Sequence, residues 1–154
     1  MFKQKNNNTE YIVNDQNHVV KGIDRGDTAA FLGIRYARGE RFKKPVLEPL
    51  AAEVTATKYG DGCPQLRQFF DESKSKSKTD MLYYTEFRKG LSFTYSEDCL
   101  NLNIFVPKNA ENLPVLLYIH GGAFVICSSD ERPFDGKEIA KEGVICVTAN
   151  YRLN

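Results

Sequence analysis

The sequence lacks several features that would place a chain of this size in a specialised class. Its 154 residues include no tryptophan, two histidines and four cysteines, and 21 basic residues nearly balance 20 acidic ones. A nucleic-acid-binding module normally carries a clear basic excess, and a disulfide scaffold is richer in cysteine. There is no CxxC pair and little histidine, which argues against a zinc site. We expect no nucleic-acid partner, no metal and no cofactor.

Long apolar runs are also missing. The longest, residues 113–119 and 144–147, are far shorter than the roughly 20 residues that cross a bilayer. Residues 1–8 are basic and polar with no apolar stretch behind them, so no secretory signal is visible. With 42% hydrophobic and 27% charged residues, the composition is that of a globular chain. We expect one domain, no membrane span and a cytoplasmic location.

Apolar alternation and turn-rich segments predict the elements of the first half. We expect residues 1–10 to be a disordered N-terminus. The expected strands are a hairpin over residues 11–13 and 18–23, a third strand over 28–36 and a weak one over 53–58, with an irregular segment at 38–49. Residues 71–80 read DESKSKSKTD and contain no apolar side chain to bury. They predict a mobile loop.

The second half predicts a βαβ unit and therefore the α/β class. Residues 100–106 alternate as a half-buried strand does, whereas 113–119 and 144–149 are apolar almost throughout. Such runs are typical of strands buried on both faces of a parallel sheet. Between them we expect a short helix, with Asp135 and Glu138 as a capping box, Ile139 and Ala140 buried, and Gly143 at its end.

The strand over residues 113–119 runs directly into His120-Gly121-Gly122-Ala123. Glycines at a strand end let backbone N–H groups approach a ligand closely. Several such N–H groups aimed at one point stabilise an oxyanion. A tight turn without chemistry fits the same residues. A phosphate loop fits less well, because no Gly-Lys-Ser/Thr follows.

Several blocks in one order resemble the type-B carboxylesterases, the family of carboxylesterases, cholinesterases and para-nitrobenzyl esterases. The blocks are FLGIRYA at 31–37 with Arg41-Phe42, CPQ at 63–65, SEDCLNLN at 96–103, HGGAF at 120–124 and NYRL at 150–153. The resemblance implies an α/β-hydrolase fold, here incomplete, with the N-terminal strands and the first βαβ unit of the central sheet. Residues 11–154 would form the N-terminal part of a single domain, truncated before the nucleophile elbow.

The resemblance also implies a serine hydrolase of small-molecule carboxylic esters, in which Gly121, Gly122 and Ala123 form the oxyanion loop. The catalytic Ser, Glu or Asp, and His should follow that loop, with Ser in G-x-S-x-G. No such motif occurs, and no histidine follows His120. We expect none of the triad in this chain and no activity of the chain alone. A non-catalytic cholinesterase-like binding or adhesion domain and a truncated pseudoenzyme remain alternatives.

Two structural pairs are implied by the same resemblance: a disulfide between Cys63 and Cys99, and a buried ion pair between Arg41 and Glu97. The missing secretory signal favours reduced cysteines instead. Arg152 would lack its usual partner and stay solvated or unpaired.

Three positions depart from the family pattern. Arg35 stands in place of Pro, Ala123 in place of Gly, and Cys127 in place of Gly. The Cβ of Ala123 disfavours positive φ. The Cys127 thiol is either reactive or inert, whereas Cys146 is expected to serve as a small hydrophobe.

Overall fold

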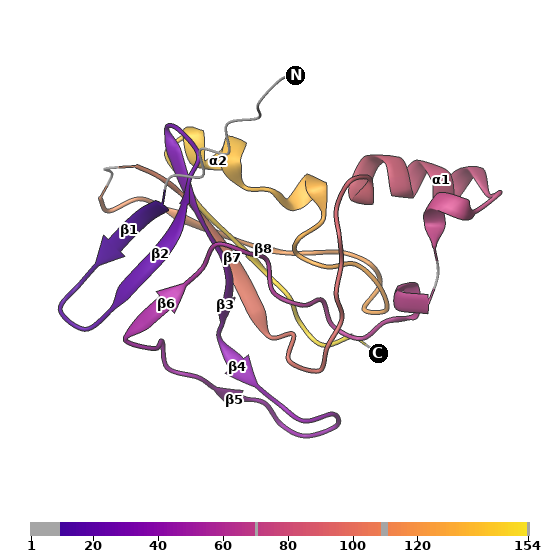
Figure 1. Ribbon diagram of the computed structural model, residues 1–154, viewed down its shortest axis with the longest axis horizontal. Helices are drawn as coiled ribbons and strands as arrows, with labels where there is room; N and C mark the ends of the chain where they lie inside the picture. Colours follow the sequence, from indigo (N-terminus) through magenta and orange to yellow (C-terminus); the bar gives the residue numbers. More distant parts are fainter. Residues whose placement is uncertain (1–9, 70, 109–110, 154) are drawn as a thin grey trace, which may run out of the picture.

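A seven-stranded mixed sheet forms the centre of the molecule in a computed structural model that describes residues 10–69, 71–108 and 111–153 (Figure 1). The strand order is β1-β2-β3-β7-β9-β8, and β6 pairs with β2 beside this path. The strands are β1 (Glu10–Asn14), β2 (Val19–Asp24), β3 (Thr28–Arg35), β6 (Glu53–Thr55), β7 (Asn101–Pro107), β8 (Val115–Ile119) and β9 (Ile145–Ala149). A separate ribbon pairs β4 (Ala37–Arg38) with β5 (Val46–Leu47).

The first half follows the sequence-based expectation closely. Strands β1 and β2 form the predicted antiparallel hairpin, and β3 pairs antiparallel with β2 and β7. Residues 38–49 are irregular apart from the short ribbon. Of the expected disordered N-terminus, residues 1–9 lie outside the described residues, and Glu10 is already the first residue of β1.

The predicted parallel pairing of the two apolar runs is confirmed, because β8 runs parallel to β9, whereas the predicted burial of β8 on both faces is wrong. Strand β7 runs antiparallel to both β3 and β9, and parallel pairing is confined to β8–β9 and β2–β6 in the described part of the chain. Strand β8 is exposed rather than buried on both faces, because it lies at the end of the strand order. Val115, Leu117 and Ile119 remain 63%, 60% and 64% exposed. The sheet thus ends in an apolar edge.

The predicted βαβ connection is present as β8, α2 (Lys137–Lys141) and β9, but its helix begins differently. Gly136 is the N-cap and provides no side-chain cap, while Asp135 Oδ1 accepts from the Lys137 N–H at 3.0 Å. The expected capping box is therefore wrong. The helix ends as expected, where the Gly143 N–H donates to the Ala140 carbonyl at 3.1 Å.

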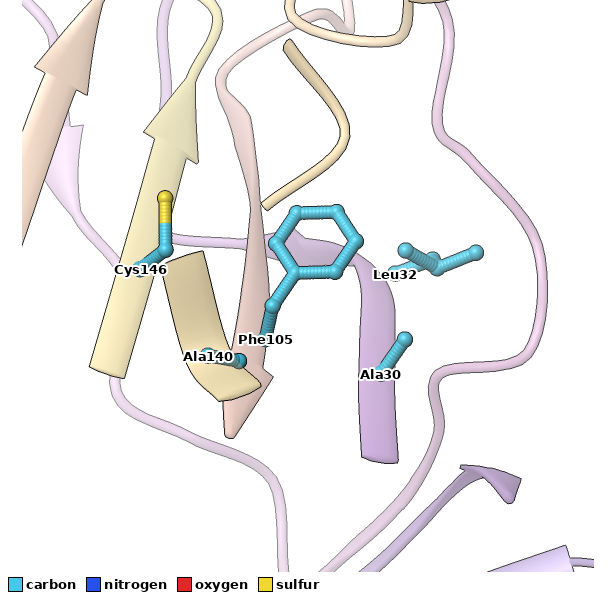
Figure 2. Close-up of a cluster of buried hydrophobic side chains, with 5 residues drawn as sticks. All are labelled: Ala30, Leu32, Phe105, Ala140 and Cys146. Carbon is cyan, nitrogen blue, oxygen red and sulfur yellow. The ribbon is translucent and has the colours of Figure 1, made fainter. Parts of the chain in front are cut away.

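Helix α2 packs on one face of the sheet, against β3, β7 and β9. Figure 2 shows the buried cluster that joins them, formed by Ala30, Leu32, Phe105, Ala140 and Cys146. Cys146 thus has the apolar packing role predicted for it, whereas Ile139 is 39% exposed and faces outward instead of inward. Ala29, Phe31 and Ala56 form a second cluster, which brings side chains of β1, β2 and β6 against β3 and β7.

Residues 63–99 cross beside the sheet as a series of short turns, seen to the right in Figure 1. They contain 3-10 turns at Leu66–Phe69 and Glu72–Lys74, helix α1 (Lys78–Tyr83) and a π-helical turn at Tyr84–Arg88. The loop predicted at 71–80 is partly helical, because the turn at Glu72–Lys74 and the first residues of α1 lie within it and side-chain hydrogen bonds support them. Ser77 accepts from the Asp80 N–H, and the Ser75 hydroxyl donates to Asp80 at 2.7 Å. Within the described residues, no helix is long and apolar enough to cross a bilayer.

Candidate functional site

The HGGAF segment leaves the exposed end of β8 in an unusual backbone conformation. Gly122, Ala123 and Phe124 all have positive φ, at +113°, +53° and +62°. The Gly122 carbonyl accepts from the N–H groups of Val125 and Ile126 at 3.0 and 3.1 Å, which closes a tight turn. A Cβ on Gly122 would lie 2.1 Å from the Ile126 carbonyl oxygen. Only glycine fits this position without moving the turn.

This turn leaves a set of backbone donors without an acceptor. The N–H groups of Gly121, Gly122 and Ala123 make no hydrogen bond to any described residue of the chain. Gly121 and Ala123 are exposed, and Gly122 is half-buried. Adjacent free N–H groups in a glycine turn at a strand end can bind an anionic oxygen. Ala123 keeps this conformation although its Cβ disfavours positive φ.

His120 supports the start of the turn rather than offering a base. It is only 3% exposed, and its Nδ1 lies 2.8 Å from the Gly121 carbonyl. Because a carbonyl only accepts, Nδ1 carries the proton, and burial lowers the pKa of the ring below its usual value. The ring stacks on Tyr151 at 4.5 Å, and the Tyr151 hydroxyl donates to the His120 carbonyl at 2.8 Å. His120 is therefore a neutral support.

Gln65 holds the end of the turn, a role that the sequence did not indicate. The Cys127 N–H donates to Gln65 Oε1 at 3.0 Å, and Gln65 Nε2 donates back to the Cys127 carbonyl at 3.0 Å. The same Nε2 reaches the Cys63 carbonyl at 3.2 Å. Cys127 has a φ of +83°, a conformation typical of the glycine that the family resemblance expects there.

Buried asparagines in β7 and after β9 anchor the serines that follow Cys127. Asn150 Oδ1 accepts from the Ser129 N–H at 2.7 Å. Asn103 Nδ2 donates to Ser129 Oγ and to Thr148 Oγ1, both at 3.1 Å. Asn103 Oδ1 in turn accepts from the Gly33 N–H at 3.0 Å. A polar residue at a buried position of an alternating strand was the available signal, because buried amides need partners.

Two buried acids lie beside this segment. Asp130 and Glu131 are 8% and 2% exposed, and burial raises the pKa of both carboxyl groups. The Tyr83 hydroxyl donates to Glu131 Oε1 at 2.6 Å and lies 3.4 Å from Cys127 Sγ. Burial also raises the pKa of the Cys127 thiol. A protonated, buried thiol is a poor nucleophile, so the structure supports the inert alternative for Cys127.

Cys63 and Cys99 are joined by a disulfide, with their Cα atoms 4.9 Å apart. Both residues are buried, and the bond closes the segment that carries Gln65. Arg41 and Glu97 form an ion pair at the surface, where their side chains are 58% and 49% exposed. The expectation that this pair is buried is wrong, and a pair so exposed contributes about 0–1 kcal/mol.

Two further arginines, Arg152 and Arg35, make polar contacts at the surface. Arg152 is exposed to solvent, as predicted, and it donates to the Lys43 backbone carbonyl at 2.6 Å. Arg35 pairs with Asp98, which gives this residue a role in place of proline. The described residues contain no cluster of three or more potential metal ligands.

The comparisons with known proteins identify the family. A model of the carboxylesterase family matches residues 10–154. Para-nitrobenzyl esterase of Bacillus subtilis (strain 168) is 39% identical over 152 residues, and cholinesterase of Mus musculus is 31% identical over 166 residues. These matches cover 94% and 99% of this chain but 28% and 26% of the two relatives.

Solved structures give the same result for the fold. A PNB esterase structure superposes with a TM-score of 0.71 at 38% identity, covering 94% of this chain and 28% of the other. A thermophilic PNB esterase gives the same TM-score and identity, with 95% and 29% covered. The chain therefore has part of the α/β-hydrolase fold and spans somewhat over a quarter of the length of these relatives. It belongs to the carboxylesterase family.

Proposed function

We propose that this chain supplies the oxyanion-binding side of a serine hydrolase of carboxylic esters. One observation carries the proposal: in the part of the chain that the structure describes, the N–H groups of Gly121, Gly122 and Ala123 have no acceptor, and they lie in a turn with positive φ after β8. When a nucleophile attacks an ester carbonyl, negative charge develops on its oxygen. Fixed N–H donors stabilise that charge, and one such donor is worth about 10²–10³ in rate.

The groups that attack the ester and move protons are not assigned to this chain. Its sequence has no G-x-S-x-G and no histidine after His120. His120 is neutral and hydrogen-bonded to its own loop, which suits support rather than proton transfer. The proposed role is therefore electrostatic: the loop binds the oxyanion, while residues outside these 154 supply the nucleophile, acid and base.

The first test is the purified 154-residue chain with a p-nitrophenyl ester. We expect no turnover above buffer, because binding of an oxyanion without a nucleophile does not form an acyl-enzyme. Release of p-nitrophenolate that a serine-directed phosphonate abolishes would contradict this division of labour.

The second test transfers the loop into a related protein. In a chimera, residues 10–153 replace the matching segment of para-nitrobenzyl esterase from Bacillus subtilis. We expect the chimera to hydrolyse a p-nitrobenzyl ester. Titration with the phosphonate counts the folded active sites, so a loss of rate is separated from a loss of folded protein. Chimera that is fully titrated but hydrolyses no ester would refute the proposed function.

A further inference from the structure

We infer that Gln65 is a positioning residue for the oxyanion loop, through its paired hydrogen bonds to the backbone of Cys127. The inference rests on the proposed function of that loop and assigns the residue that fixes its exit. Gln65 touches neither the free N–H groups nor any reacting atom. Its effect reaches Gly122 and Ala123 through the residues that connect them to Cys127.

The two ends of the loop are held by different means. At the entry, β8 pairs with β9 as far as Ile119, and the Tyr151 hydroxyl holds the His120 carbonyl. At the exit, the turn bonds to the Gly122 carbonyl stop at Ile126. Cys127 is the next residue, and its backbone N–H and carbonyl both bond to Gln65. Within the turn the Phe124 ring contacts Tyr151, and the Gln65 amide then makes the hydrogen bonds that tie the end of the turn to another part of the fold.

The strain at Cys127 explains why a fixed partner is needed there. Its φ of +83° costs a non-glycine residue of the order of 1–3 kcal/mol. Such a conformation persists only where contacts with the surrounding structure hold it in place. A primary amide carries an acceptor oxygen and an NH₂ group with two donors at the same end, so it satisfies both backbone groups of Cys127 at once. Gln65 is only 4% exposed, so little water competes for these bonds.

Gln65 is itself firmly anchored. Its Nε2 also donates to the carbonyl of Cys63, whose sulfur is bonded to Cys99 near the start of β7. We call the two hydrogen bonds between Gln65 and the backbone of Cys127 the clamp. The disulfide holds the chain segment that carries the clamp, and the clamp holds the end of the loop. This connection gives the CPQ block a physical role: the cysteine anchors the segment and the glutamine reaches the loop.

The test uses Gln65→Met, which keeps side-chain length but removes both hydrogen bonds to Cys127 and the one to Cys63, and Gln65→Glu, which keeps only an acceptor at neutral pH. Gln68→Glu is the matched control, because Gln68 lies in the same closed segment outside the clamp. Hydrogen exchange of the 154-residue chain, read by mass spectrometry on peptides over 120–131, should become several-fold faster in both Gln65 variants. It should not change in Gln68→Glu.

The second measurement is kinetic and uses the chimera. A displacement of about 1 Å in catalytic groups costs about 10² in rate, so we expect Gln65→Met to lower kcat by about 10-fold to 100-fold with KM within about twofold. A carboxyl group in place of the Gln65 amide would face two carbonyl oxygens in a buried site, which raises its pKa. Its protonated form donates to Cys127 again. The ratio of the kcat of Gln65→Glu to that of the unsubstituted chimera should therefore rise as pH falls from about 8 to about 6, and the ratio for Gln68→Glu should stay flat.

The outcomes separate the two proposals. Unchanged exchange over 120–131 in both Gln65 variants overturns the inference, whatever the chimera does. Faster exchange with an unchanged kcat in a phosphonate-titrated chimera also overturns it, since the clamp would then be structural only. If exchange becomes faster in the Gln65 variants but the unsubstituted chimera is titrated and has no turnover, the proposed function is refuted, and Gln65 still fixes the turn.

Discussion

Substitution of two adjacent glycines by alanine should have opposite outcomes, and the loop geometry predicts which is tolerated. Gly122 has a φ of +113°, and a Cβ there would lie 2.1 Å from the Ile126 carbonyl oxygen. Gly121 has no positive φ, and its Cβ would meet no atom within 4 Å. Gly122→Ala and Gly121→Ala add the same methyl group one residue apart, so each controls for the other.

The cost of Gly122→Ala has two parts. A non-glycine residue at strongly positive φ costs about 1–3 kcal/mol. The overlap with a backbone oxygen also forces the turn open, which breaks the two hydrogen bonds to the Gly122 carbonyl at about 1 kcal/mol each. The sum is about 3–5 kcal/mol, so the native turn becomes a minor conformer. For an oxyanion loop, this removes correctly placed donors and lowers the rate by about 10²–10³.

The assay is kcat/KM of the chimera with a p-nitrobenzyl ester, scaled to the sites that the phosphonate titrates. We expect a loss of at least about 10² for Gly122→Ala, the usual effect of losing one oxyanion donor. For Gly121→Ala we expect a loss of at most about threefold, because the added Cβ is unobstructed and the donors stay in place. Equal losses in both variants would show that bulk near the ester matters rather than backbone conformation. No loss in Gly122→Ala would refute the oxyanion role of this turn.

Three other perturbations test the surrounding scaffold. Cys99→Ser in the chimera should lower the thermal midpoint, because loss of a disulfide that closes a loop of 36 residues costs about 4 kcal/mol in the chain-entropy model. An unchanged midpoint would show that residues between Cys63 and Cys99 are held in place without this bond. Leu117→Lys should reduce self-association of the 154-residue chain in sedimentation, because a charge on the exposed β8 edge opposes strand pairing. Burial lowers the folded-state pKa of His120, so its contribution to stability is present above about pH 6.5 and is lost as pH falls further. His120→Phe, which keeps the stack on Tyr151, should therefore have a thermal midpoint that falls less between about pH 7.5 and about pH 5.5 than that of the unsubstituted chimera.

Local patterns predicted the elements better than they predicted their burial. The hairpin, β3, β7, α2 and β9 follow from alternation, turn residues and Gly143, all of which act over a few neighbouring residues. The apolar run of β8 predicted a strand covered on both faces, yet it lies at the sheet edge with Leu117 60% exposed. The apolar residues of β8 show that the strand is suited to burial, but whether other elements cover it depends on the tertiary structure.

Polar contacts were the least predictable feature of the site. The residues of the proposed oxyanion loop were visible because two glycines directly follow the apolar run of β8. The sequence showed Gln65 only as part of the CPQ block and did not indicate its role. Its partner Cys63 is 2 residues away, but its partner Cys127 is 62 residues away, so only the tertiary structure brings them together. Residues 71–80 are partly helical although they contain no apolar side chain, because short-range serine and aspartate hydrogen bonds support the helical turns.

Several residues of the blocks that identify the family support the loop over residues 120–129. SEDCLNLN provides Cys99 for the disulfide and Asn103 for Ser129, whereas NYRL provides Asn150 for the same serine and Tyr151 for His120. Apart from the disulfide, each of these contacts ends on backbone or on a side chain within residues 120–129. A buried polar network whose members are satisfied makes the structure around it rigid. The motif residues Asn103, Asn150 and Tyr151 therefore help to hold the backbone near Gly122 in the conformation that the proposed chemistry needs.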